Sequence, residues 1–222
     1  MEALTRAGRI IGILLIIQMI GTTIVNFVLE APLFDAQGFL ENAATYSQQI
    51  AVAVVLGLLM EALWVAIAIT AFPILYQRTR TMALWFIALA VVILAVAVVE
   101  NAAVMSMVSV SEAFAGATAA ERAQFETFRV VVTSARNWPH LIARMFDGVA
   151  IFAFYAALYR AELVPRVLAG FGLIAVVLQV TGVAMALFGL EVIFPLLAPL
   201  GLSLLTLAGW LIAKGFREPP PR

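Results

Sequence analysis

The chain has 222 residues, of which 64% are hydrophobic and 12% are charged, and its formal net charge is +0. Soluble domains are about half apolar and about a quarter charged, so this composition, with a mean hydropathy of +1.08, excludes a water-soluble globular fold. The absence of cysteine excludes disulfides, thiolate metal sites and thiol redox chemistry. The single histidine excludes a multi-histidine metal site or a bis-histidine haem within one chain.

Six apolar runs are each long enough to cross a bilayer core of about 30 Å, which needs about 20 residues of helix. The runs show neither strict alternation nor the turns of a barrel, so they are expected to be helical. The sequence therefore predicts an all-α membrane protein, a bundle of six transmembrane helices in a single domain. The predicted spans are Ile10–Leu29, Ile50–Pro73, Met82–Met105, Pro139–Tyr159, Val167–Gly189 and Val192–Ala213.

The first run is expected to remain as a span, because it is too long for a signal peptide and no A-x-A cleavage site follows before Asp35. Basic residues predict the orientation. They precede the first span, follow the last, and occupy the loops after the second and fourth spans, whereas the opposite loops are mainly acidic. Since Lys and Arg remain on the cytoplasmic side, both termini are predicted to be cytoplasmic.

An outer amphipathic helix is predicted over about residues 119–136, between the third and fourth spans. Thr118 and Glu121 have the spacing of a capping box, and Phe125, Phe128 and Val132 share one helical face. This segment is expected to be a separate helix that lies on the outer membrane surface, with the next span starting at Pro139 because proline suits a first helical turn.

Four acidic or basic residues other than histidine fall inside the predicted spans, and each is costly to insert into hydrocarbon unless it is paired or serves a function. At about 1.5 Å per residue, all four are expected in the outer half of the bilayer. With two polar neighbours they form the candidate ligand-binding or proton site: Glu61, Glu100, Asn101, His140, Arg144 and Asp147.

Three of these residues, His140, Arg144 and Asp147, are spaced i, i+4 and i+7 and so share one helical face. Arg144 is expected to pair with carboxylates from neighbouring helices through its planar guanidinium. Three interpretations remain open. The cluster is a polar site that binds a ligand or relays protons, a structural lock between spans, or a set of groups that reach headgroup water because the helix ends differ from those predicted.

The sequence contains no G-x-S-x-G, H-E-x-x-H or Walker-type glycine loop, and its only lysine is Lys214. The favoured function is therefore a non-enzymatic binding or accessory protein. One alternative is a small proton-coupled carrier that uses Glu61, Glu100 and Asp147; another is a membrane-embedded enzyme with His140 and Asp147 as acid and base. No cofactor or metal is expected. The expected partners are membrane lipids with a small ligand or another membrane protein, and not nucleic acid.

Several short motifs near the ends of the spans resemble those of an uncharacterised bacterial family of six-span membrane proteins, a domain of unknown function. They are Arg9-Ile10-x-Gly12, Tyr159-Arg160, Leu163-Val164-Pro165-Arg166-x-Leu168, Pro199-x-Gly201 and Trp210-Leu211-x-x-Lys214-Gly215. The resemblance implies six spans in a bacterial plasma (inner) membrane, and it implies no activity, cofactor or site residue.

Overall fold

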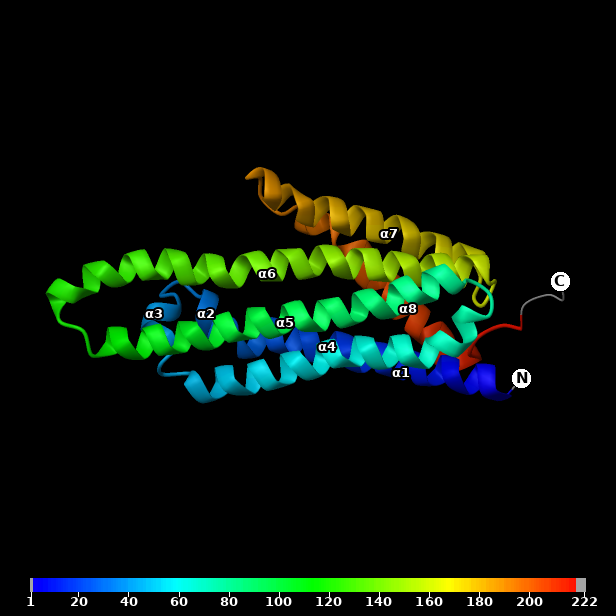
Figure 1. The fold of residues 1–222 in the computed structure, drawn as a ribbon, viewed down its shortest axis with the longest axis horizontal. Coiled ribbons are helices and arrows are strands. Elements are labelled where there is room, and N and C mark those ends of the chain that lie inside the picture. Colours follow the sequence, from blue (N-terminus) through cyan, green and yellow to red (C-terminus); the bar gives the residue numbers. More distant parts are fainter. Residues whose placement is uncertain (1, 219–222) are drawn as a thin grey trace.

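The computed structural model describes residues 2–218 and is almost entirely helical (Figure 1). Six helices in this part of the chain are long and apolar enough to cross a membrane, and none of its residues forms a strand. The predicted all-α fold with six such helices is confirmed. The long helices are α1 (Glu2–Ile24, continued by the π-helix η1, Val25–Leu29), α4 (Ser47–Tyr76), α5 (Arg80–Ala115), α6 (Ala119–Arg160), α7 (Arg166–Ala184, continued by the 3-10 helix η2, Met185–Phe188) and α8 (Ala198–Lys214, preceded by the 3-10 helix η3, Phe194–Leu196).

The six long helices form a closed ring in chain order, since each packs against the next and α8 packs against α1. Both termini lie at one end of the bundle with the α4–α5 and α6–α7 connections, and we call this the terminal end (Figure 1). The α5–α6 connection lies at the opposite end, the hairpin end, near the short helices α2 (Ala31–Phe34) and α3 (Phe39–Asn42).

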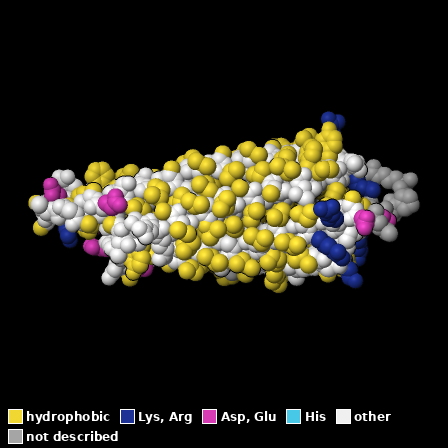
Figure 2. All heavy atoms as spheres, turned by 90° about the horizontal axis from the view of Figure 1, so that it is seen from below, with side chains coloured by type: hydrophobic (Ala, Val, Ile, Leu, Met, Phe, Trp, Pro, Cys, Tyr) yellow, Lys and Arg dark blue, Asp and Glu magenta, His cyan; other side chains and the backbone are white. Residues whose placement is uncertain are grey.

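The outer surface of the bundle suits lipid over its middle part. Figure 2 shows apolar side chains covering the long middle of one face, with the charged side chains gathered at the two ends. Ile20, Val91 and Ile174 are among the large apolar side chains that face outward. A contiguous apolar surface of this extent marks a membrane-facing region in a protein whose helices match the bilayer thickness.

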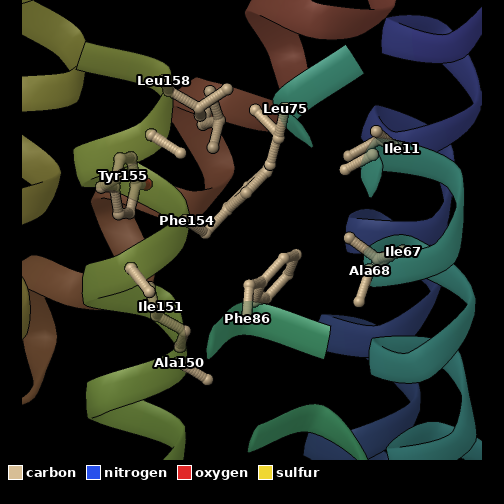
Figure 3. Close-up of a cluster of buried hydrophobic side chains, with 14 of the residues drawn as sticks. Ile11, Ile67, Ala68, Leu75, Phe86, Ala150, Ile151, Phe154, Tyr155 and Leu158 are labelled. Carbon is tan, nitrogen blue, oxygen red and sulfur yellow. The ribbon is translucent and has the colours of Figure 1, made fainter. Parts of the chain in front are cut away.

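The main core fills the interior of the ring toward the terminal end. Figure 3 shows its side chains turned inward from α1, α4, α5 and α6. Phe86 and Phe154 stack with ring centroids 4.8 Å apart, and Ile11 and Leu75 pack around them without exposure. The fully buried Tyr155 keeps its hydroxyl satisfied, because Oη lies 3.0 Å from Ser203 Oγ on α8.

Small residues bring α1 and α8 close together. A Cβ atom at Gly12 would lie 2.9 Å from the carbonyl oxygen of Ala208 and 3.0 Å from the backbone nitrogen of Ile212. At the C-terminal end of α8, Gly215 has φ of +69° and packs against Thr5. Glycine suits both places, because only a residue without a Cβ fits such a close backbone approach or adopts this φ without strain.

The segment predicted as a separate outer helix differs from the expectation. Residues 119–136 are helical and start at the predicted capping box, with Glu121 Oε2 accepting from Thr118 N at 2.8 Å and from Thr118 Oγ1 at 2.7 Å. The prediction that they form a separate surface helix is wrong, because α6 continues without a break past Pro139 to Arg160. Of the predicted apolar face, Phe125 and Val132 pack on the small core that includes Phe114 of α5, with the rings of Phe125 and Phe114 edge-to-face at 5.6 Å, whereas Phe128 stays 54% exposed.

This continuity shapes the hairpin end. With 42 residues, α6 is about 63 Å long, roughly twice the thickness of a bilayer core. The α5–α6 hairpin is therefore longer than a bilayer core requires, and α2 and α3 pack on it through a second small core that includes Leu33, Phe39, Val104 and Met107.

Candidate functional site

A small polar cavity lies between α1–η1, α4, α5 and α6, in the half of the bundle nearer the hairpin end. Its volume is about 40 Å³, which exceeds the roughly 10–15 Å³ that a single water molecule needs. Five of the six residues in the predicted site line it: Glu61, Glu100, Asn101, His140 and Arg144. The sixth, Asp147, lies one helical turn further along α6 and contacts Arg144.

Arg144 on α6 forms two short ion pairs. Its Nη2 donates to Glu61 Oε1 on α4 at 2.8 Å, and its Nη1 lies 2.8 Å from Asp147 Oδ2 on its own helix. Gln179 on α7 donates from Nε2 to the backbone oxygen of Arg144 at 3.2 Å. The expected pairing of this arginine is therefore present: its guanidinium connects α6 to α4, and its backbone oxygen connects α6 to α7.

A second set of contacts joins α6 to α5 and to the residue that follows η1. Arg136 Nη2 donates to Glu30 Oε2 at 3.0 Å and lies 3.3 Å from Glu100 Oε1 on α5. The same carboxylate oxygen of Glu100 lies 2.8 Å from His140 Nδ1. Phe34 on α2 covers the Arg136 guanidinium, with 4.7 Å between the guanidinium carbon and the ring centroid.

One face of α6 supplies both arginines of the ion pairs, together with His140 and Asp147. Arg136, His140, Arg144 and Asp147 are spaced i, i+4, i+8 and i+11, so they lie one above another along the helix. Because α6 continues without a break past Pro139, Arg136 is held in the same row as the other three. The continuous helix is thus what brings the two sets of ion pairs into one network.

Acidic groups outnumber basic ones in this network. The contacts join four carboxylates, those of Glu30, Glu61, Glu100 and Asp147, to only two guanidinium groups. With every carboxylate ionised and His140 neutral, the formal charge is −2. Outside the spans, burial raises the pKa of the Glu30 carboxyl even though Arg136 opposes this shift. An excess of buried negative charge is relieved by protons or by a bound cation.

Among residues 2–218, one fully buried carboxylate oxygen of the network has no hydrogen-bond partner. Glu61 is only 7% exposed and lines the cavity, yet its Oε2 atom is unpaired there while Oε1 accepts from Arg144. The Nε atoms of Arg136 and Arg144 and Oε1 of Gln179 are also buried without a partner in this part of the chain. Unsatisfied buried polar atoms are uncommon in folded proteins, and each calls for an explanation such as a bound water, ion or ligand.

The cavity adjoins a larger cleft on the outside of the bundle. The cleft has a volume of about 390 Å³, lies between η1, α2 and α6, and shares Asn26, His140 and Arg144 with the cavity. Its other walls are Phe27, Phe34, Arg136 and Asn137.

The position at which α8 begins explains why the cleft beside η1 is open. Gly12 of α1 lies against Ala208 of α8, so the first residue of α8, Ala198, is level with about residue 22 of α1. The π-helix η1 extends past the level at which α8 begins, so α8 does not run alongside it. Such π-helical turns interrupt the regular backbone ladder and often occur at functional sites.

The structure brings all six predicted site residues together, and their role in binding a ligand or protons stays a prediction. Sequence reasoning missed Glu30 and Arg136. Both lie outside the predicted spans, although the spacing of four residues from Arg136 to His140 and again to Arg144 is a signal that places Arg136 on the same helical face. Glu30 had no such signal, because its burial depends on how α2 and α6 meet above η1.

Comparison with protein families gives one match. The model of the family described as "Domain of unknown function (DUF4386)" matches residues 10–215 of the chain, which confirms the resemblance to a family of unknown function. Neither a curated protein nor a solved structure matches the chain.

Proposed function

This chain belongs to the DUF4386 family, whose function is unknown, and from its site we propose a non-enzymatic membrane protein that binds a small ligand through a positively charged ammonium group. The single observation that carries the proposal is the unpaired Oε2 atom of Glu61, a buried carboxylate oxygen of a residue that lines the cavity. An ammonium group placed in the cavity would donate a charge-assisted hydrogen bond to this oxygen.

Charge and size both support a primary ammonium group as the ligand. The network has a formal charge of −2 with His140 neutral, so a single positive charge reduces the imbalance. An ammonium carries three N–H donors and is close to water in size, which suits a cavity of about 40 Å³. Asn101 Oδ1 is near Gly57 on the cavity wall and offers a second acceptor.

The donor set favours an organic cation over a metal ion. Within residues 2–218, no three His, Cys, Asp or Glu side chains are grouped so that they could hold a metal. The lining also offers little for covalent catalysis: among the described residues that border the cavity, Thr22 carries the only hydroxyl group, and its Oγ1 accepts a hydrogen bond from Gln18 Nε2 at 3.2 Å. These features support a binding role.

The test is calorimetric titration of methylammonium into the protein in an uncharged detergent. Saturable binding is expected, and Glu61→Gln should weaken it by about tenfold or more, since a hydrogen bond to a charged group contributes about 1.5–3 kcal/mol. Glu126→Gln, which changes an exposed carboxylate elsewhere on α6, should bind like the parent protein.

A second variant guards against loss of fold. Gly57→Val adds a side chain to the cavity wall where a Cβ would meet nothing closer than 3.7 Å, so it should fill the cavity while leaving every charged group in place. The matched control is Gly209→Val on α8, where a Cβ would meet nothing within 4 Å. If methylammonium binding is absent, or is unaffected by Gly57→Val, the cluster is a structural lock.

One observation favours a proton-coupled carrier as a second candidate. The 2.8 Å contact between His140 and Glu100 sits where the cavity and the cleft adjoin, so the pair could pass a proton between them. In liposomes with an internal pH dye, free methylamine crosses the bilayer unaided and raises the internal pH, so protein-free liposomes set the baseline. A carrier would change the rate of this pH change, and Glu100→Gln would return it to the baseline, whereas a protein that only binds would leave the rate at the baseline.

We also propose a bacterial plasma membrane as the location, with the terminal end in the cytoplasm. The support is the concentration of arginine at that end, including Arg6, Arg9, Arg78 and Arg166, together with the rule that basic loops remain cytoplasmic. In this orientation the cavity and the cleft lie in the outer half of the bilayer. Lipids are then the immediate neighbours of the cleft.

A further inference from the structure

We propose that the ligand is a single-chain amphiphilic amine whose ammonium group occupies the cavity and whose alkyl chain leaves through the cleft between η1 and α6 into the surrounding lipid. This inference rests on the proposed function, because it adds a tail and an entry route to the same ammonium site. The ammonium site itself uses only the cavity, and the inference adds a role for the cleft.

The first argument is that the cavity and the cleft are adjacent and share lining residues. Asn26, His140 and Arg144 each border both the cavity of about 40 Å³ and the cleft of about 390 Å³. A group bound at Glu61 Oε2 therefore has a neighbouring space large enough for a chain of many carbon atoms, whereas the cavity itself has room only for the headgroup. The two volumes match the two parts of an amphiphile.

The second argument is the chemistry of the cleft wall. Phe27 is 78% exposed and Phe34 is 49% exposed, and both line the cleft beside the charged groups. Ile20 and Ile24 of α1, which precede Phe27 by seven and three residues, also face outward, so the cleft opens onto an apolar surface. Aromatic rings at such an opening can pack along an alkyl chain, and an apolar tail there need not be exposed to water.

The third argument is the sign of the charge. Two guanidinium groups border the cleft, but Arg136 already pairs with Glu30 and Glu100, and Arg144 already pairs with Glu61 and Asp147. Each arginine thus meets two carboxylates, and the net field at the end of the cleft is negative. An amine headgroup is favoured there and a carboxylate or sulfate headgroup is disfavoured.

The chain contains no cysteine, so a single introduced thiol can report occupancy of the cleft. Phe27→Cys places the thiol in the cleft, and Phe188→Cys provides a control at an equally exposed phenylalanine in η2, outside the cleft lining. Both variants are reconstituted into phosphatidylcholine nanodiscs. The measured quantity is the rate of modification by a methanethiosulfonate spin label, a thiol-specific reagent that does not consume amines.

Dodecylamine should slow labelling at Phe27→Cys at least fivefold and leave Phe188→Cys unchanged. Methylammonium should compete with dodecylamine and restore labelling, because it takes the same cavity without covering the cleft. Dodecanoate, which has the same chain length and the opposite charge, should give no protection. Adding Gly57→Val to Phe27→Cys should remove the protection by dodecylamine, since the headgroup site is then filled.

The outcomes separate the two proposals. If methylammonium binds to the purified protein but dodecylamine protects Phe27→Cys no more than Phe188→Cys, the amphiphile is wrong and the ammonium site stands. Equal protection by dodecanoate would also overturn the amphiphilic amine, since the tail alone would then be responsible. If methylammonium binding is absent and Gly57→Val changes neither measurement, the ammonium site fails and the amphiphile fails with it.

Discussion

Arg144 and Glu61 are joined by a 2.8 Å ion pair between α6 and α4, two helices that are not neighbours in the ring. The pair therefore reaches across the interior instead of along a helix–helix seam. Arg136 makes a similar crossing to Glu30, which follows the end of η1. Because these contacts run across the ring, they fix the distance between its opposite sides in the half of the bundle that holds the cavity.

Arg144→Ala should destabilise the protein more than any single carboxylate variant in the network. Its loss leaves both Glu61 and Asp147 buried without their cation, and breaking a buried pair typically costs about 3–5 kcal/mol. Glu61→Gln or Asp147→Asn removes one charge and leaves Arg144 the other partner. Thermal unfolding of the purified protein in detergent measures the difference, and an Arg144→Ala protein with parental stability would mean that the guanidinium pairing contributes nothing.

Ser111→Ala should loosen the α2–α3 segment. The buried Ser111 Oγ on α5 donates to the carbonyl oxygen of Leu40 and accepts from the backbone nitrogen of Ala44, both at 2.8 Å. Its removal leaves two backbone groups unsatisfied, at a cost of about 1–3 kcal/mol each. Amide hydrogen exchange over residues 31–46 should accelerate. Ser109→Ala is the control, because Ser109 is exposed and bonds only within its own helix.

Gly12→Ala should weaken the contact between the first and last helices. The added methyl group would lie too close to backbone atoms of Ala208 and Ile212 in α8. These atoms cannot move away by a change of rotamer, as side-chain atoms can. Overpacking of this kind costs about 1–3 kcal/mol. Gly209→Ala, which meets nothing within 4 Å, should leave the melting temperature in detergent unchanged or slightly raised. Equal melting temperatures for the two variants would contradict the close α1–α8 packing.

The two ends of the bundle should react with reagents applied from opposite sides of the membrane. Gln37→Cys at the hairpin end and Gln77→Cys at the terminal end replace exposed residues in a chain without other cysteines. In intact cells, a membrane-impermeant maleimide should label only Gln37→Cys, because basic residues keep the terminal end in the cytoplasm. Labelling of both positions from outside would rule out this topology.

The number of long helices and most of the site could be predicted from local pattern. Runs of apolar residues depend only on bilayer thickness, and the four ionisable residues were conspicuous because hydrocarbon makes each of them costly. The spacing from His140 to Asp147 also gave the shared face of α6 correctly.

What the sequence did not reveal depends on contacts between distant segments. Pro139 was expected to start a helix, yet α6 passes through it because its first half packs on α5. That single difference moves Arg136 from the membrane surface into the ion-pair network. The cleft could not be predicted from local sequence patterns either, since it depends on α8 beginning nearer the terminal end than η1.

The closed ring has a consequence for biosynthesis. Of the two ring neighbours of α1, α4 is synthesised soon after it, but α8 is synthesised only after α4, α5, α6 and α7. Until then the glycine face of α1 has no protein partner and can be met only by lipid or by insertion machinery. The contact between α1 and α8 therefore forms only after the other helices of the ring have been synthesised, and a nascent chain that stalls before α8 leaves the glycine face of α1 uncovered.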